Sequence, residues 1–299
     1  MEKSCYQWYD VPVEIEKRGK RMRNVKIVAD SSANLLELEG VAFATAPLKI
    51  LAGDREFVDD ATLDVEGMVT WFDSYKGKSK TSCPNPGDWI TAFGDAEEVF
   101  CITITSGLSG SYNAACVAKQ MYESENPGKR VYVIDSLSAG PELVLIIEKL
   151  REWIGQDKPF GEICEEIEYY KKSTGLMFML ESLKNFAANG RVSPAVAKIA
   201  GVLGIRVVGK ASNQGTLEPT NKCRGVAKAL DALLTNIMDA GLKTGKVHIA
   251  HCQNAAAAEK MAQMLRQVVP QVQISIHTCR GLCCYYAEKG GLLIGFEKK

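Results

Sequence analysis

The sequence lacks an excess of charge of either sign, a long apolar run and an apolar leader. Its 36 Lys and Arg residues balance 36 Asp and Glu residues, so no overall field attracts nucleic acid or an anionic membrane. The longest apolar stretches, such as residues 143–147, are far shorter than a bilayer span. Residues 1–24 are charged and tyrosine-rich, unlike a signal peptide. We therefore expect a cytoplasmic protein without a nucleic-acid partner or a segment inserted in a membrane.

Motifs for nucleotide and metal chemistry are also missing. The sequence has no Walker A motif, no Gly-rich kinase loop and no obvious pair of metal-binding carboxylate clusters. Ten cysteines are many, but no Cys-x-x-Cys motif occurs, and the cluster Cys279, Cys283 and Cys284 lacks a well-spaced fourth ligand. Because no export signal is present, we expect reduced thiols, no bound metal and no cofactor.

The first half of the chain alternates between strand-like and helix-like segments. With 46% hydrophobic residues in 299, the chain can bury a substantial core. Alternation of strands with helices is typical of a parallel sheet covered by helices on both faces, so we predict an α/β domain over residues 25–157. The expected strands are 26–29, 43–51, 99–103 and 131–134, and the expected helices are 65–73, 111–123 and 141–153.

The polar run 155–159 contains glycine and proline and predicts a domain boundary. It divides the chain into an N-terminal extension (1–24), an α/β domain (25–157) and a mixed α/β domain (158–299). Residues 212–216 have the composition of a hairpin turn. The strands expected after the boundary are 176–180, 207–210, 246–251, 272–276 and 292–297, and the helices are 160–173, 181–189, 224–240 and 255–268.

The segment 102–115 is the most informative, because a strand pattern breaks into a Ser/Gly turn and then begins a helix. Small residues allow close approach of a ligand, and the first N–H groups of a helix favour an anion. In parallel sheets, ligands bind beyond the carboxyl ends of the strands, where Thr105-Ser106 and Asp135-Ser136 are expected. The motif predicts a phosphate or carboxylate site at residues 106–111; the alternative is an ordinary connection with capping serines.

Two further motifs carry polar side chains that suit a binding site. Thr81-Ser82 is a hydroxyl pair followed by two prolines before an aromatic helix start, and it is also compatible with a simple capped turn. His277-Thr278 ends a predicted strand, where a histidine is often a hydrogen-bonded structural residue.

Together these motifs resemble the DegV family, the bacterial fatty-acid-binding proteins that serve fatty acid kinase. The motifs occur in the family's order and are spread over nearly all of residues 25–299. The chain departs from the family pattern at Cys83 and Cys279-Arg280. The matching motifs are Asp30-Ser31, Thr81-Ser82 with Pro84, residues 105–112, Asp135-Ser136, residues 183–186, residues 190–193, Lys222-Cys223-Arg224 and His277-Thr278.

The resemblance implies two domains that bind one long-chain fatty acid between them, with its carboxylate at the interface. For an acid of about C14 to C18 the tail dominates affinity, because each buried methylene contributes about 0.8 kcal/mol. The family's binding proteins do not transform the acid; a separate kinase with a dihydroxyacetone-kinase-like domain phosphorylates it. The implied carboxylate site comprises Thr81, Ser82, Ser109, Gly110, His277, Thr278 and Arg224, and the implied head-group or kinase contacts are Arg191 and Arg280.

Other interpretations remain open at this point. An esterase or acyltransferase would use Ser109 as the nucleophile and His277 as the base, although residues 107–111 lack the spacing of a nucleophile elbow. A sensor of another small carboxylic acid would use the same fold. Candidate residues for an acyl channel, which are equally compatible with plain core packing, are Leu176, Phe178, Leu180, Leu183, Ile199, Leu203 and Ile205.

Overall fold

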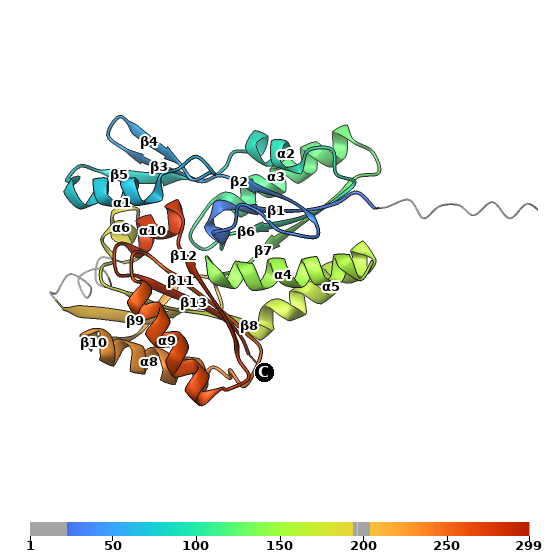
Figure 1. The fold of residues 1–299 in the computed structure, drawn as a ribbon. Helices are drawn as coiled ribbons and strands as arrows, with labels where there is room; N and C mark the ends of the chain where they lie inside the picture. The colour runs from blue at the N-terminus through green and yellow to red at the C-terminus, as the bar shows by residue number, and fades with distance from the viewer. Residues whose placement is uncertain (1–22, 194–195, 197–203, 299) are drawn as a thin grey trace, which may run out of the picture.

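The described strands form three sheets, of four, six and three strands. The structure is a computed structural model, and it describes residues 23–193, 196 and 204–298. Figure 1 shows the four-stranded sheet in the half that carries the N-terminus and the six-stranded sheet in the other half. Short 3-10 turns follow the first strand (Ser31–Ala33) and precede the six-stranded sheet (Lys171–Ser173).

The first sheet has the order β2-β1-β6-β7, with all strands parallel. Because side chains alternate across a strand, Ile27 and Phe100 pack against α4 and α5, and Val28 and Cys101 pack against α2 and α3. Helices thus cover both faces, which confirms the predicted α/β architecture. The elements are β1 (Val25–Asp30), β2 (Ala42–Ala46), β6 (Glu98–Thr103), β7 (Arg130–Asp135), α2 (Pro86–Phe93), α3 (Ser111–Glu125), α4 (Pro141–Gly155) and α5 (Phe160–Tyr170).

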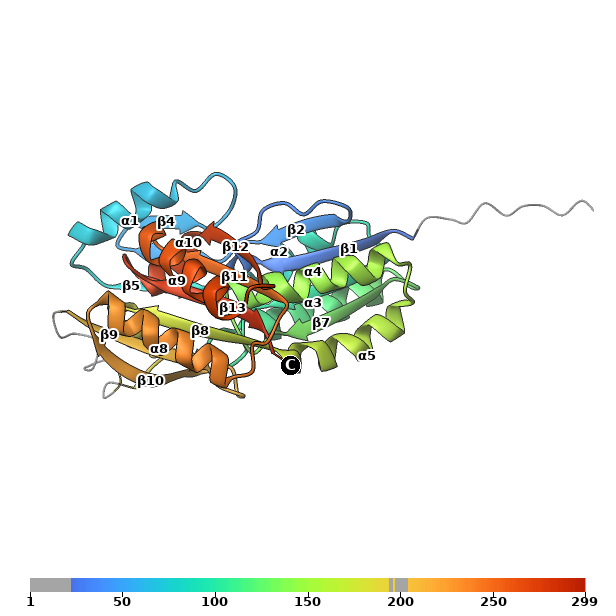
Figure 2. The same ribbon diagram turned by 60° about the horizontal axis from the view of Figure 1, so that its bottom comes forward.

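The second sheet is mixed, as predicted, with the order β10-β9-β8-β13-β11-β12. Only its β11–β12 pair is parallel. Helices α8 and α9 cover one face (Figure 2), where they share a core with the side chains of that face. The elements are β8 (Thr174–Leu180), β9 (Ile205–Ala211), β10 (Leu217–Arg224), β11 (Lys246–His251), β12 (Gln273–Thr278), β13 (Leu292–Glu297), α8 (Val226–Asp239) and α9 (Ala255–Val268).

A small antiparallel sheet of order β4-β3-β5 extends from the first half of the chain toward the second sheet (Figure 1). Its residue Ile50 and Met68 of α1 share a buried cluster with Phe178 of β8. The single strand predicted over 43–51 is wrong, because Pro47 lacks an N–H and separates β2 from β3. The elements are β3 (Lys49–Ala52), β4 (Arg55–Val58), β5 (Ser79–Ser82), α1 (Val65–Ser74), α6 (Lys184–Ala188) and α10 (Gly281–Ala287).

Helix α5 belongs with the first sheet, since Ile163 and Ile167 share its core. The predicted boundary at 157/158 therefore falls in the turn between α4 and α5, and the second sheet begins at Thr174. The breakers of that turn include Asp157, whose φ is 57°. A tight turn between two helices needs the same residue types as a domain linker, so composition does not distinguish the two.

Helix α4 contacts both large sheets. Its apolar side chains lie in the core of the first sheet, and its start packs on β13, where a Cβ on Gly295 would lie 2.5 Å from the Glu142 backbone nitrogen. The buried Glu142 carboxylate accepts hydrogen bonds from Ser138 Oγ at 2.5 Å and Thr174 Oγ1 at 2.7 Å. Figure 1 shows α4 between the two sheets, so it forms a shared layer.

The predicted N-terminal extension lies mostly outside the described residues. Its last two residues are part of the first domain: Arg23 pairs with Glu98, and Asn24 accepts hydrogen bonds from the backbone of Glu97 and Glu98. Among the helices that the structure describes, none combines the length and the apolar character needed to cross a bilayer.

Candidate functional site

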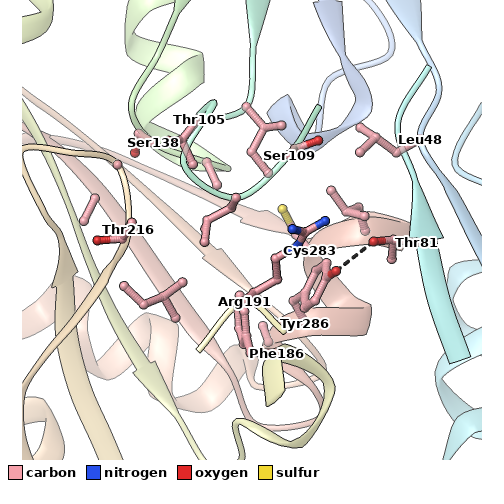
Figure 3. Close-up of a pocket in the computed structure, with 18 of the residues that line it drawn as sticks. Leu48, Thr81, Thr105, Ser109, Ser138, Phe186, Arg191, Thr216, Cys283 and Tyr286 are labelled. Carbon is pink, nitrogen blue, oxygen red and sulfur yellow. Dashed lines mark hydrogen bonds between the residues drawn. The ribbon is translucent and has the colours of Figure 1, made fainter. Parts of the chain in front are cut away.

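A cavity of about 300 Å³ lies between the two large sheets (Figure 3), a volume at the lower end of the range for small-molecule sites. Its first-sheet walls are loops at the carboxyl ends of β2, β6 and β7, the edge at which parallel sheets bind ligands. Its other walls come from β5, β8, β13, α6, α10 and the β9–β10 hairpin. The lining residues include Thr81, Ser82, Cys83, Thr105, Ser109, Gly110, Ser138, Leu176, Phe178, Leu180, Phe186, Arg191, Gly215, Thr216, Cys283, Tyr286 and Leu293.

The buried carboxylate of Asp30 fixes the Ser/Gly turn. Its Oδ2 accepts hydrogen bonds from Ile104 N at 2.8 Å and Ser111 Oγ at 2.7 Å, and its Oδ1 accepts one from Ser32 N at 3.2 Å. Burial raises the pKa of Asp30, and these hydrogen bonds oppose that shift. The turn is thereby tied to the end of β1 and to the first residue of α3.

Ser109 and Gly110 line the cavity immediately before α3. The Ser109 Oγ accepts a hydrogen bond from Ser111 N at 3.2 Å, so its own hydroxyl proton is available to another acceptor. The N-terminus of this 15-residue helix carries partial positive charge. This part of the cavity therefore favours an anionic group.

Tyr286 and Thr81 form a hydroxyl pair on one side of the cavity. Their oxygens lie 2.7 Å apart (Figure 3), and the Tyr286 ring packs on Phe186 at an interplanar angle of 32°, with 4.6 Å between centroids. Burial raises the pKa of Tyr286, so the phenol remains protonated at neutral pH and can donate a hydrogen bond. One proton of this pair joins the two oxygens, and the other can point to a ligand.

Arg191 is the one cationic side chain among the described residues that line the cavity, and no carboxylate lines it there. Its backbone N–H donates to Phe186 O at 2.8 Å, immediately after Gly190, whose φ is 69°. Figure 3 shows its guanidinium in the same part of the cavity as Tyr286 and Thr81. The guanidinium favours ionisation of Tyr286 and of Cys83, although burial still raises the pKa of both groups. The cavity thus has a positive end.

The rest of the cavity wall is largely apolar. Leu176, Phe178 and Leu180 occupy alternate positions of β8 and face the cavity, as does Leu293 of β13. The intervening Met177 and Met179 instead enter the core under α8 and α9. The second sheet therefore supplies one face to the cavity and the other to its own helices.

Helix α10 supplies Cys283 and Tyr286 to the cavity. The buried carboxylate of Asp59 accepts hydrogen bonds from Gly281 N and Leu282 N, both at 2.9 Å, at the start of this helix. Arg280 Nε lies 3.7 Å from Asp59 Oδ1. The run at 279–281 that departs from the family pattern is thus a helix start held by a carboxylate.

The comparisons with known proteins agree with this arrangement. The family model for DegV, described as an uncharacterised protein family, matches residues 24–299. The chain belongs to the DegV family. A DegV domain-containing protein of Streptococcus pneumoniae strain R6 is 41% identical over 276 residues, covering 91% of this chain and 98% of the relative. The resemblance drawn from the sequence motifs is therefore confirmed.

Two solved DegV-type structures superpose closely. A DegV family protein from Eubacterium eligens, loaded with heptadecanoic acid, has a TM-score of 0.90 and 44% identity, covering 92% of this chain and 100% of that chain. The Streptococcus pneumoniae Fatty Acid Kinase (Fak) B3 protein, loaded with linoleic acid, has a TM-score of 0.90 and 40% identity, covering 92% and 99%. The DegV fold is thus shared over nearly the whole described chain.

The structure brings together five of the polar residues that the family resemblance implied. Thr81, Ser82, Ser109, Gly110 and Arg191 all line the cavity. Ser82 is exposed and its hydroxyl donates to Cys83 O at 3.3 Å, so it lies at the margin of the site.

The other implied residues lie elsewhere. Arg224 is an exposed residue at the end of β10, and Thr278 is exposed on β12. The guanidinium of Arg280 donates to Asp60 O. None of these three residues lines the cavity, because the elements that carry them point their side chains to solvent or to Asp59 and Asp60.

His277 does not line the cavity either. It lies on the edge strand β12, with its Nε2 3.2 Å from Nδ1 of His248. His248 Nε2 is 3.5 Å from Glu148 of α4, and Lys246 Nζ is 2.7 Å from the same carboxylate. The pKa of Glu148 is lowered to about 2, first by His248 and then by Lys246. His277 is thus part of a contact between α4 and the second sheet.

Sequence reasoning missed the contribution of α10 and α6. Phe186 ends the family-like run 183–186, but neither that run nor the pattern around Tyr286 pointed to a place in the cavity wall. Leu176, Phe178 and Leu180 were candidates and do line the cavity. Leu183 is buried in the neighbouring cluster without lining the cavity, and Ile205 lies in β9. The candidates Ile199 and Leu203 lie outside the described residues.

The nine cysteines in the described part of the chain are free thiols. Cys252, Cys279 and Cys284 are buried behind the cavity wall, and burial raises the pKa of the Cys283 thiol, which faces the cavity. Over residues 23–193 and 204–298, no group of three or more metal-ligating side chains is suitably placed.

Proposed function

We propose that this protein binds one long-chain fatty acid in the cavity between its sheets and presents the carboxylate to a separate fatty acid kinase. The observation that carries the proposal is the arrangement of the cavity: β8 and β13 present apolar walls, and Arg191, its only described cation, lies beside the Thr81–Tyr286 hydroxyl pair, apart from the hydroxyls of Thr105, Ser138 and Thr216 (Figure 3). An amphipathic anion fits such a cavity, with its charge at Arg191 and its hydrocarbon against β8.

The carboxylate is held by donors from both halves of the chain. Ser109 Oγ, Gly110 N and the N-terminus of α3 supply one side, and the Thr81–Tyr286 pair supplies the other. Arg191 supplies the balancing charge. No carboxylate lines the described part of the cavity.

The acyl chain lies against Leu176, Phe178, Leu180 and Leu293. These side chains are at most 9% exposed, so the cavity wall is dry, and each buried methylene contributes about 0.8 kcal/mol. The Eubacterium eligens and Streptococcus pneumoniae relatives, with heptadecanoic and linoleic acid, support a ligand of this class. Tail burial then determines affinity, and the polar end determines orientation.

The chain acts as a carrier rather than as a catalyst. The likeness to the Fatty Acid Kinase (Fak) B3 protein supports a kinase as the partner, and we infer a kinase with a dihydroxyacetone-kinase-like nucleotide domain. The phosphoryl group is transferred on that partner, while this chain exposes the carboxylate at Arg191. The esterase alternative gains no support, because its base, His277, contacts His248 and does not line the cavity with Ser109.

The proposal is tested by native mass spectrometry of protein purified from a bacterial host. We expect a bound long-chain acid, or uptake of added oleate after delipidation. Ser109→Ala removes one donor, worth about 1–2 kcal/mol, and should weaken oleate binding about 5- to 30-fold.

The matched control is Ser106→Ala, an exposed serine of the same turn that does not line the cavity. It should bind oleate like the wild type. An empty protein that takes up neither oleate nor palmitate contradicts the proposal, and equal affinity of Ser109→Ala and wild type places the carboxylate elsewhere.

A further inference from the structure

The Phe178 ring is seated on a glycine of the neighbouring strand. Phe178 and Gly209 are register partners in the antiparallel β8–β9 pair. A Cβ added to Gly209 would lie 2.5 Å from Phe178 Cζ and 2.7 Å from its Cε2, closer than real Cβ contacts allow. The ring therefore lies down over the backbone of β9, in the space that any other residue would fill.

In this position the ring lies flat on the sheet and forms part of the cavity wall. Phe178 is 3% exposed, and it lies in the middle of the three β8 residues that face the cavity. A ring displaced from Gly209 has the sheet backbone below it, including Glu218 O at 2.6 Å from the same Cβ position. The open space beside the ring is the cavity that it lines, although an added Cβ would also press on the β10 backbone at Glu218. The width of the cavity at this point thus depends on the pair.

We propose that Phe178, seated on Gly209, sets the width of the acyl part of the cavity and thereby decides between bent and straight chains of equal length. The inference rests on the proposed function. A cis double bond bends an acyl chain and demands width, whereas a saturated chain packs well in a narrow channel. Packing in apolar sites responds to changes of a single methylene. A whole aromatic ring should therefore strongly affect which acyl chains fit.

The same sheet contains a matched pair on its opposite face. Phe296 of β13 lies over Gly175 of β8, where an added Cβ would lie 3.1 Å from Phe296 Cζ. Phe296 is 1% exposed and belongs to the core under α8 and α9, away from the cavity. It has the same chemistry and the same cross-strand geometry without contact to the ligand.

The test offers the delipidated protein an equimolar mixture of oleate and stearate, which differ by one cis double bond, and measures the bound ratio by mass spectrometry of extracted acids. Phe178→Leu widens the cavity and should raise the oleate-to-stearate ratio at least about fivefold, a modest effect for a change of this size in an apolar pocket. Gly209→Ala pushes the ring into the cavity and should lower the ratio. Phe296→Leu should leave the ratio within about twofold of the wild type.

Ratios that stay within about twofold of the wild type for both Phe178→Leu and Gly209→Ala would overturn the inference, as would a shift of equal size in Phe296→Leu. If Phe178→Leu or Gly209→Ala does not fold, judged by circular dichroism, Phe178→Met removes the flat ring while keeping apolar bulk, and it should also raise the ratio. A wild type that binds neither acid defeats the proposed function itself. A wild type that binds both, with unresponsive variants, defeats only the role of Phe178.

Discussion

Two pairs of side chains in this molecule each meet through polar atoms, but the surroundings of the two pairs differ. The Thr81 and Tyr286 hydroxyls meet at 2.7 Å within the cavity, whereas His248 and His277 meet at 3.2 Å between β11 and the edge strand β12, where His248 contacts Glu148 of α4. Only nine positions separate His277 from Tyr286 in the chain. The intervening turn and the start of α10 redirect the chain from the sheet edge to the cavity. Position relative to the apolar channel, rather than residue type, thus determines which pair can meet a ligand.

The largest change in oleate affinity should come from removing the charge of Arg191, which lies beside Thr81 and Tyr286. Arg191→Met removes the cation while keeping a long side chain, and we expect oleate affinity to fall about 10- to 30-fold. That range is the lower part of what a charged hydrogen bond contributes, since Arg191 is solvent-exposed. Titration calorimetry with delipidated protein measures it. His277→Gln is the comparison and should change affinity less than about twofold; a larger loss in His277→Gln than in Arg191→Met would reverse the assignment of the two regions.

A smaller effect should follow from the cavity hydroxyl itself. Tyr286→Phe removes one neutral donor, worth about 1 kcal/mol, so oleate affinity should fall about fivefold. The neighbouring Tyr285→Phe is the matched control, because its hydroxyl contacts Ser79 at 2.7 Å and Asn189 at 3.0 Å outside the cavity. It should lose stability without losing affinity in the folded protein. Equal affinities for the two variants would contradict a ligand contact at Tyr286.

The histidine pair should affect stability and leave binding unchanged. Partial desolvation, and then the charge of His248, lowers the pKa of His277 in the folded protein, and Glu148 opposes that shift. Below an unfolded pKa of about 6.5, the unfolded chain therefore binds more protons at this residue, and the folded state loses stability as the pH falls. Because His277 is exposed on β12, solvent screens these interactions and we expect only a small contribution to stability.

His277→Gln should make the unfolding free energy less dependent on pH between about pH 5 and pH 6.5. Urea unfolding of wild type and variant across this range measures the difference. The buried carboxylates, whose raised pKa values act in the opposite direction, are the same in both proteins and cancel. An unchanged slope would show that His277 titrates alike in the folded and unfolded chain.

Much of the fold could be predicted because periodicity reflects burial directly. Most strands of both large sheets and the helices α3, α4 and α9 follow apolar runs or the helical period, but the eight-residue strand β10, with its largely polar sequence, was not predicted. The short strands β4 and β5 could not be predicted, since polar runs such as 79–82 become strands only through pairing with β3. The boundary at 157/158 depended on breaker residues, which turn a chain between helices as readily as between domains.

Some residues of the candidate site could likewise be predicted from the sequence, and others could not. Ser109 and Gly110 could be identified because a strand, a Ser/Gly turn and a helix are adjacent in the sequence. Tyr286 could not, because its place in the cavity depends on Asp59, which holds the start of α10 from more than two hundred residues earlier in the chain. A carboxylate that acts at this distance leaves no local pattern. The histidine motif looked equally functional, since a sequence does not show toward which side a strand end turns.

The shared position of α4 has a consequence for the protein as a whole. Its apolar side chains pack beneath the first sheet, while Pro141, Glu142 and Glu148 contact the second. A fragment that ended at residue 173 would expose the flank of this helix that β13 covers, and a fragment that began there would lack its central support. We therefore expect the two halves to unfold together, and neither half to fold by itself as a soluble fragment.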